Sequence, residues 1–254
     1  MPTPEDSHER TPILGHELER RVFLASAAGL ATGLLATTPV QAQEAAAKPL
    51  VPRAEAFAEA HTPKPLPFDA GSLNGLSARL IESHWTNNYG GSVRTLNETK
   101  KRLAAALAAT DTPPFVYNGL KREHLMRTGS VVLHELYFDN LGGNGAADAA
   151  ARTFIASAFG AFDRWETEFR RIAAGLGGGA GWVVLGYNRH FGTVENYWLA
   201  DHMHFPSGAE PLLVMDMYEH SYQLDFGAAA ARYIDAFFAN INWERVLARV
   251  AGIR

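Results

Sequence analysis

The sequence predicts an α+β protein in which an N-terminal antiparallel α-hairpin precedes a domain with a small, three-stranded antiparallel sheet flanked by helices. Two long helical patterns come first along the chain, and short strand-like runs come later, after a glycine-rich turn at residues 175–181. Elements separated in this way indicate an α+β arrangement. The segment 142–145 (Gly-Gly-Asn-Gly) ends the second helical pattern. We therefore expect a hairpin domain over residues 69–144 and an α+β domain over residues 145–254.

The two hairpin helices are predicted from residues that recur on one face. The first pattern covers residues 77–109 and the second covers residues 119–141, with Pro113-Pro114 between them. Each pattern places apolar residues three or four positions apart, which is typical of a helix with one buried face. Each also carries a histidine on that apolar face, His84 in the first helix and His134 in the second.

The second domain is predicted to begin with one long helix over residues 146–174. Strands are predicted for residues 182–187, 193–199 and 212–215. Closing helices are predicted for residues 218–224, 228–240 and 243–250.

Composition narrows the class of protein. The chain has 254 residues, of which 47% are hydrophobic and 20% are charged, an ordinary globular mix. A net charge of −4 gives no basic surface for nucleic acid. The chain contains no cysteine, which excludes disulfides, thiolate metal sites and a cysteine nucleophile. Residues 43–68 are rich in Ala, Pro and Lys and predict an extended linker.

The first 42 residues are predicted to be a cleavable export signal. Arg20-Arg21 precede an uncharged, apolar stretch over residues 22–35, and Val40-Gln41-Ala42 offers the small residues of a cleavage site. The stretch is too short for a good transmembrane helix. The arginine pair resembles the twin-arginine export signal, with Glu19 where Ser or Thr is usual, and implies a periplasmic or secreted protein without membrane contact after cleavage. A buried N-terminal helix is the alternative.

Four side chains form a candidate metal site. Besides His84 and His134, these are Asp216, which follows the apolar run 212–215, and His220, four residues further on. A carboxylate at the end of a buried strand is costly unless it is paired or bound to a metal. Three imidazoles and one carboxylate suit iron, manganese or zinc, and without thiolates a working site is favoured over a structural zinc site. Ordinary buried core histidines are the alternative interpretation.

The C-terminal part of the chain resembles a known family. Residues 212–222 contain Asp-Met-Tyr-Glu-His, which is similar to the Asp-x-Trp-Glu-His signature of the iron/manganese superoxide dismutases. Further similar segments are Leu66-Pro67-Phe68, Gly179-Ala180-Gly181-Trp182 and Asn242-Trp243-Glu244-Arg245-Val246. The resemblance spans about Leu66 to Val250, and the family fold is an α-hairpin followed by an α+β domain. It implies an enzyme that converts superoxide to dioxygen and hydrogen peroxide, with one iron or manganese ion per chain, in a homodimer.

The resemblance also implies a role for individual residues. His84, His134, Asp216 and His220 are the four metal ligands in chain order. Glu219 reaches across the dimer to the metal-ligating histidine of the other subunit.

Three more residues receive roles in the same way. Tyr222 matches a pocket tyrosine and, with His202, is assigned to catalysis. His202 lies where relatives carry a Gln or His that bonds to metal-bound solvent, and His204 is the competing candidate for that position. Trp182 belongs to the surroundings of the metal.

The chain departs from the family pattern around the entrance to the metal. Asn88 and Ser92 stand where a histidine and a tyrosine usually follow the first ligand. Tyr218 replaces the hallmark tryptophan, Val184 stands where a second tryptophan often occurs, and Gln223 replaces a dimer-contact tyrosine. Two other functions therefore stay open: a metal-binding oxidoreductase with a different substrate, such as peroxide, and a non-catalytic binding protein. The choices of iron or manganese, and of dimer or tetramer, also stay open.

Overall fold

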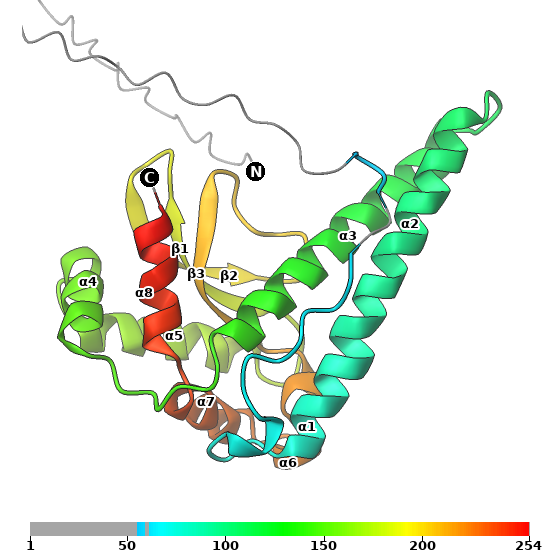
Figure 1. Cartoon of the computed structure of the whole chain (residues 1–254). Helices are drawn as coiled ribbons and strands as arrows, with labels where there is room; N and C mark the ends of the chain where they lie inside the picture. The colour runs from blue at the N-terminus through cyan, green and yellow to red at the C-terminus, as the bar shows by residue number, and fades with distance from the viewer. Residues whose placement is uncertain (1–54, 59–60, 254) are drawn as a thin grey trace, which may run out of the picture. The chain divides into compact units, whose positions relative to one another are not determined.

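The structure is a computed structural model that describes residues 55–58 and 61–253. The predicted export signal, residues 1–42, lies outside the described residues. Within the part that is described, a helical hairpin is followed by a three-stranded sheet and further helices (Figure 1). The predicted α+β fold class is therefore confirmed.

The first arm of the hairpin is one continuous helical rod with a wider turn inside it. After a short 3-10 turn, η1 (Ala70–Ser72), it consists of α1 (Ala78–Ser83), the π-helical segment η2 (His84–Tyr89) and α2 (Gly90–Ala108). Ser77 begins α1 as predicted, because its Oγ accepts a hydrogen bond from the N–H of Leu80 at 3.1 Å. The π-helical segment was not predicted, and it changes which residues share a face with His84.

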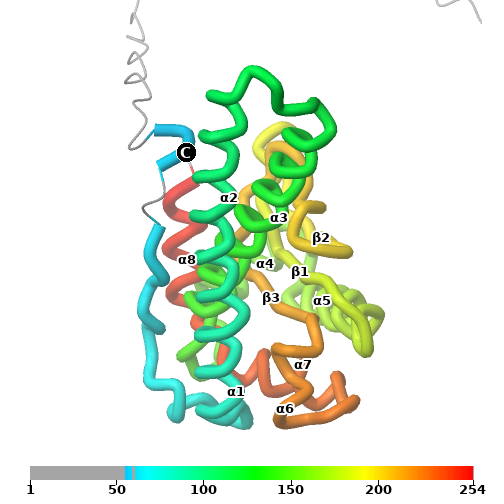
Figure 2. The backbone as a smooth tube through the Cα atoms, turned by 90° about the vertical axis from the view of Figure 1, so that its right-hand side faces the viewer, coloured from blue at the N-terminus to red at the C-terminus, as the bar shows by residue number. Residues whose placement is uncertain are grey.

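The second arm is α3 (Pro114–Asp139), which runs antiparallel to α2 (Figures 1 and 2). It begins at Pro114 and not at Gly119 as predicted. Proline is well suited to the first turn of a helix, where its missing N–H would have no partner in any case. The proline pair therefore both ends the connection from α2 and starts α3.

The prediction of one long helix over residues 146–174 was wrong. The structure has two helices, α4 (Ala149–Phe159) and α5 (Phe162–Leu176), and the chain turns between them at Gly160. Gly160 has φ of 79°, a left-handed conformation that commonly ends a helix and that glycine adopts without strain. The turn allows α5 to pack on β1 and β2.

The sheet has the strand order β2-β1-β3, and both pairs of strands are antiparallel. Its strands are β1 (Trp182–Asn188), β2 (Thr193–Leu199) and β3 (Ala209–Asp216). Strand β3 starts earlier than predicted and includes Pro211, which an edge strand tolerates because one side of it makes no ladder hydrogen bonds. At the far end of β3, Asp216 lies opposite Trp182 of the central strand. The pairing of β3 with β1 thus places Asp216 next to Trp182.

The segment after β3 differs from the predicted helix over residues 218–224. The N–H of Met217 still bonds to the carbonyl of Gly181 at 3.0 Å, so the chain stays extended beyond the end of β3. A 3-10 turn, η3 (Glu219–Ser221), and a one-turn helix, α6 (Gln223–Phe226), follow. The closing helices are α7 (Ala230–Ala239) and α8 (Trp243–Gly252).

Helix α8 connects the hairpin to the sheet. Arg249 donates a hydrogen bond from Nε to the carbonyl of Leu212 in β3 at 2.8 Å. Its guanidinium also contacts Asp139 and Asn140 at the end of α3. Most of this side chain is buried, so its three partners replace the water that it loses. Arg249 therefore links β3 to the C-terminal end of α3.

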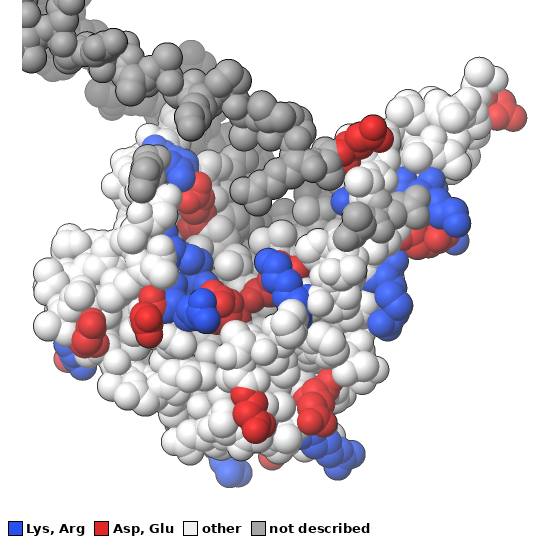
Figure 3. Space-filling model, viewed as in Figure 1, with Lys and Arg blue, Asp and Glu red and all other residues white. Residues whose placement is uncertain are grey.

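The described surface gives two broad observations. On the face shown in Figure 3, acidic and basic side chains lie side by side, without a continuous basic area. In the described part of the chain, no helix has both the length and the apolar character needed to cross a membrane.

Candidate metal centre

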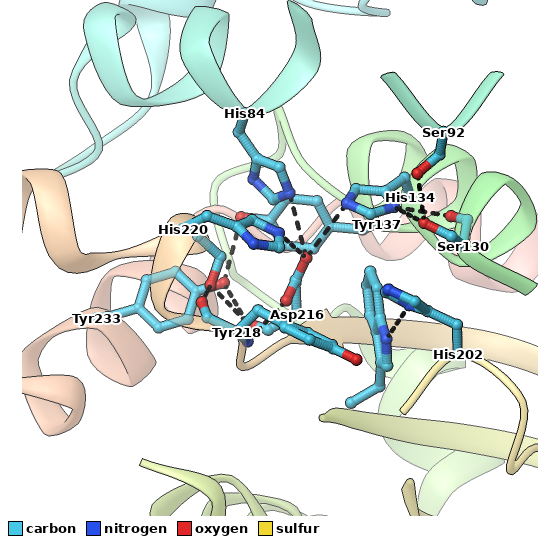
Figure 4. A network of polar contacts seen from close by, with 12 residues as sticks. His84, Ser92, Ser130, His134, Tyr137, His202, Asp216, Tyr218, His220 and Tyr233 are labelled. Carbon is cyan, nitrogen blue, oxygen red and sulfur yellow. Dashed lines mark hydrogen bonds and ion pairs between the residues drawn. The ribbon is translucent and has the colours of Figure 1, made fainter. Parts of the chain in front are cut away.

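Four side chains from four different elements meet at one point (Figure 4). His84 comes from η2, His134 from α3, Asp216 from the end of β3 and His220 from η3. The Nε2 atoms of His84, His134 and His220 lie 3.1, 3.6 and 3.2 Å from Oδ2 of Asp216. The four potential ligand atoms all lie within 4.8 Å of one another. The structure thus brings together the four residues predicted as metal ligands.

The chemistry of this cluster fits a metal ion. Both ring nitrogens of His84 and Nε2 of His134 are buried without a hydrogen-bond partner in the described chain. Asp216 is fully buried, and Nε2 of His134 faces its Oδ2 with a lone pair, because Nδ1 of that ring donates to the carbonyl of Ser130. Lone pairs and a carboxylate oxygen that point at one another repel unless a cation lies between them. Nitrogen and oxygen ligands in this number suit iron, manganese or zinc.

The protonation states also suit metal binding. Burial lowers the pKa of His84, and burial lowers that of His134 to about 3, so both imidazoles are neutral at physiological pH. Burial alone would raise the pKa of Asp216, but the neighbouring His220 and His84 hold it below its ordinary value. His84, His134 and Asp216 are therefore already in the deprotonated form that metal coordination requires.

His134 is oriented by its own helix. Its Nδ1 donates to the carbonyl of Ser130 at 2.7 Å, one turn earlier in α3. Because that carbonyl only accepts, Nδ1 carries the proton and Nε2 faces the cluster with a lone pair. The Oγ of Ser130 also lies 2.8 Å from the Oγ of Ser92 in α2. Ser92 therefore supports the helix that carries His134 and has no direct contact with the four ligands.

Asp216 is held from its other side. Its Oδ1 accepts the N–H of Tyr218 at 2.8 Å, which leaves Oδ2 for the cluster. Its main-chain carbonyl accepts the hydroxyl of Tyr233 at 2.7 Å and that of Ser221 at 3.0 Å. Tyr137 lies 3.2 Å from Tyr233, oxygen to oxygen, in the buried layer behind the carboxylate. These contacts fix the position of Asp216 before any ligand binds.

His202 lies beside the cluster, and His204 does not. The Nε1–H of Trp182 donates to Nδ1 of His202 at 3.0 Å, so the proton of a neutral His202 is on Nε2. The ring of His202 lies 6.0 Å from that of His134. His204 is more than half exposed, and its Nδ1 lies 2.7 Å from Oδ1 of Asp201. The geometry favours His202 as the residue next to the centre.

The loop that carries His202 approaches α3 at a glycine. A Cβ atom on Gly129 would lie 1.8 Å from the carbonyl oxygen of His202. No side chain fits in this space, and the loop could not keep its position if one were present. Gly129 thus determines how close His202 comes to α3.

The other predicted site residues lie further away. Tyr222 is buried, and its hydroxyl accepts the N–H of Gly178 at 3.0 Å, without a contact to the four ligands among the described residues. Asn88 is partly exposed in η2, and Glu219 is exposed in η3.

The π-helical segment explains why Asn88 is not at the centre. A π-helix bonds residue i to residue i+5, so it brings positions five apart closer to one face than an α-helix does. Both His84 and Tyr89 are buried accordingly, and the Tyr89 ring lies 6.3 Å from that of His134. Local propensity carries no signal for such a segment, and the sequence analysis missed Tyr89 for that reason.

A polar cluster beside the centre was also missed. Glu135, which directly follows His134, has its Oε1 2.7 Å from Nε2 of His61 and accepts the hydroxyl of Tyr89 at 2.9 Å. Lys64 forms an ion pair with the same carboxylate. The sequence offered one signal for this cluster, because the charged Glu135 directly follows His134, which was expected to be buried.

The segment 61–68 therefore has contacts beside both hairpin ligands (Figure 1). The main chain of Lys64 donates to the hydroxyl of Tyr89 at 2.8 Å and accepts the indole N–H of Trp85 at 2.9 Å. Trp85 follows His84, as Glu135 follows His134. Residues predicted as part of an extended linker are thus bound along the hairpin.

Fold and site together define a class of protein: an α-hairpin and an α+β domain that share one candidate metal site of three imidazoles and one carboxylate. Residues 147–249 match the family model described as iron/manganese superoxide dismutases, C-terminal domain. The chain belongs to the iron/manganese superoxide dismutase family, as the relatives show, and the predicted family is confirmed.

Relatives named for either metal are similar to the chain. It is 50% identical over 188 residues to a superoxide dismutase [Fe] of Cupriavidus metallidurans, covering 74% of this chain and 95% of the relative. It is 36% identical over 182 residues to a superoxide dismutase [Fe] of Aquifex pyrophilus, covering 69% and 84%. It is 32% identical over 192 residues to a superoxide dismutase [Mn] of Mycolicibacterium fortuitum, covering 73% and 90%.

The close approach at Gly129 yields a prediction about stability. Gly129→Ala should lower the free energy of unfolding by roughly 2 kcal/mol or more, because the added Cβ forces the loop of His202 away from α3. Gly119→Ala is the matched control, since it is in the same helix and a Cβ there meets nothing within 4 Å. That variant should be stabilised by about 0.5–1 kcal/mol. Urea unfolding of the two variants and the wild type measures the difference, and equal shifts would contradict the argument.

Proposed function

We propose that the protein converts superoxide to dioxygen and hydrogen peroxide at one iron or manganese ion per chain, bound by His84, His134, Asp216 and His220. The observation that carries the proposal is the convergence of three imidazole nitrogens on one buried carboxylate oxygen. Relatives named superoxide dismutase, one of them 50% identical, support the reaction. The name of that relative also favours iron over manganese.

The residues of the chain have separable tasks in this reaction. A bound iron or manganese ion supplies one-electron chemistry, in which one superoxide is oxidised to dioxygen and a second is reduced, with two protons, to hydrogen peroxide. Asp216 contributes a negative charge that favours the higher oxidation state of the ion. The hydrogen bonds to Asp216 from Tyr218, Tyr233 and Ser221 keep that charge in place during turnover.

His202 is proposed to hold a proton beside the metal. Trp182 occupies Nδ1 of His202, so Nε2–H is the atom available for donation. The ring lies near His134 and is stacked on Tyr218 at 4.8 Å, which restricts its rotation. A donor fixed in this way is ready to bond to a developing negative charge without reorganisation.

Metal content and turnover together test the function. Alanine at any one of His84, His134, Asp216 or His220 should reduce the bound iron and manganese from about one ion per chain to a small fraction and abolish superoxide consumption. Thermal stability should fall as well, because a bound metal stabilises the folded state. Elemental analysis of protein from its native host, stopped-flow superoxide decay and calorimetry measure the three effects.

Two further variants separate binding from turnover in the same experiment. His202→Ala should keep the metal and lower turnover about 10–100-fold, whereas the control His204→Ala should leave both unchanged. Stoichiometric zinc without redox turnover would contradict the proposed function. Full metal with turnover of peroxide alone would instead indicate an oxidoreductase of different substrate.

We also propose a homodimer in which Glu219 contacts the metal centre of the other chain. His220 is the one ligand whose side chain is appreciably exposed, at 27%, while those of His84 and Asp216 are at 0%. Its Nε2 faces Asp216, and its Nδ1 has no hydrogen-bond partner among the described residues. An exposed glutamate from a second copy would supply that partner and orient the ring.

Sedimentation and metal retention test this contact. Glu219→Ala should increase the monomer fraction at micromolar concentration and weaken metal retention about 10–100-fold. Glu244→Ala, an equally exposed glutamate at the start of α8, is the control and should change neither. A wild-type protein that sediments as a monomer at all concentrations would overturn the dimer.

Export through the twin-arginine route is proposed from the sequence of residues 1–42 alone. Lys at both Arg20 and Arg21 keeps the charge but should retain the precursor in the cytoplasm, because the receptor reads the arginine pair itself. Cell fractionation and N-terminal sequencing measure the outcome, with a mature chain expected to begin near Gln43. Continued export of the double variant would indicate the general secretory route, and a mature N-terminus at Met1 would exclude a cleaved signal.

A further inference from the structure

The metal centre has one side that is open to solvent. His84, His134 and Asp216 are 1%, 1% and 0% exposed, so the hairpin and the sheet close the centre from behind. His220 and the adjacent Tyr218 are partly exposed. These two side chains are therefore the part of the centre that solvent contacts.

Most hydroxyl groups around the centre already have partners. Ser92 and Ser130 bond to each other at 2.8 Å and are both buried. Tyr233 donates to the carbonyl of Asp216, and Tyr137 bonds to Tyr233. None of these four hydroxyls is free to meet a molecule that enters from solvent.

The hydroxyl groups of Tyr89 and Ser221 also have hydrogen-bond partners. The hydroxyl of Tyr89 donates to Glu135 and accepts the N–H of Lys64. The hydroxyl of Ser221 is held by the carbonyls of Asp216 and Tyr218. The contacts of these hydroxyls are structural.

Tyr218 is different from all of them. Its hydroxyl has no hydrogen-bond partner among the residues that the structure describes. Its ring is stacked on His202 at 4.8 Å and 12°, and on His220 at 5.3 Å and 22°. Its N–H is bonded to Asp216, so the main chain and the ring of this residue both have fixed neighbours. In Figure 4, the hydroxyl end of the ring extends to the side of the centre where His202 lies.

We propose that the hydroxyl of Tyr218 donates a hydrogen bond to the anion that approaches the metal, and so sets the affinity of the site for small anions. The inference rests on the proposed function, since it assigns a contact for the anionic substrate of that same centre. A hydrogen bond to an anion is stronger than one between neutral groups, and the donor here is on a ring that stacks on two imidazoles. The stacking on His202 and His220 places this donor next to one ligand and next to the proposed proton donor.

Azide is a suitable probe because it is a small anion that binds to a metal without being consumed. Its dissociation constant is measured by absorbance titration of the metal-loaded protein, with the signal normalised to metal content. Tyr218→Phe keeps the stacked ring and removes the hydroxyl, so azide should bind about tenfold more weakly, which corresponds to the loss of one hydrogen bond to a charged group. Tyr117→Phe is the matched control, since Tyr117 is also partly exposed but lies in the first turn of α3, far along the helix from His134. It should bind azide like the wild type.

Superoxide kinetics give a second readout. A contact made equally to the bound substrate and to the transition state changes KM and leaves kcat unchanged. Tyr218→Phe should therefore raise KM for superoxide in parallel with the azide constant, with kcat per bound metal within about twofold of the wild type. A merely structural role for Tyr218 would lower metal content or kcat and leave the azide constant of the loaded fraction unchanged.

Failure of the inference about Tyr218 can be distinguished from failure of the proposed dismutase function. Azide affinity of Tyr218→Phe within twofold of the wild type would overturn the inference, whatever the activity. If Tyr218→Phe retains no metal, Tyr218→Leu decides, because leucine is apolar and has no hydrogen-bond donor in its side chain, and weaker azide binding is again expected. A wild-type protein that binds azide but consumes no superoxide would overturn the dismutase function. The azide affinities of Tyr218→Phe and the wild type would then still test the role of Tyr218.

Discussion

The fold depends on a buried carboxylate, Oδ2 of Asp216, on which three imidazoles converge. A charge without water is destabilising unless other groups compensate it, and here the compensation comes from both halves of the protein. His84 and His134 belong to the hairpin, whereas Asp216 is the last residue of β3 and His220 lies in the turn that follows it. Packing of the hairpin on the α+β domain and assembly of the metal site are therefore one event. A metal ion bound at this point stabilises the contact between the domains as well as its own ligands.

Two features of the hairpin keep its ligands aimed at that carboxylate. The π-helical segment η2 gives His84 and Tyr89 a common buried face, and Tyr89 reaches Glu135 beside His134. The segment 61–68 then binds Trp85, Tyr89 and Glu135 from outside. Exposed ion pairs contribute little to stability, but Glu135 is only 11% exposed in its side chain, and three groups converge on it. The N-terminal segment is therefore part of the framework of the metal site.

The fold class and the four residues of the cluster could be predicted from the sequence, because both depend on patterns of residues that are close together in the chain. Apolar periodicity located the hairpin helices and the strands, and Asp216 and His220 stand four positions apart in one motif. The errors have physical causes that no periodicity expresses. Gly160 ends a helix through its left-handed backbone conformation, and η2 shifts the buried face from Asn88 to Tyr89. The role assigned to Tyr222 stays a prediction, and its hydroxyl accepts the N–H of Gly178 at 3.0 Å.

The division of tasks between the two domains explains how the entrance can change while the ligands stay in place. The hairpin contributes buried ligands and the Ser92–Ser130 pair, all within the packed contact of α2 and α3. The solvent-facing wall is formed by His202, Tyr218 and His220, and these come from the connection before β3 and the turn after it. A substitution in those loops alters which donor an entering anion meets without disturbing the packing of helices. In the proposed anion contact, the hydroxyl of Tyr218 on the loop side therefore takes the place of the Ser92 hydroxyl, which is bound to Ser130.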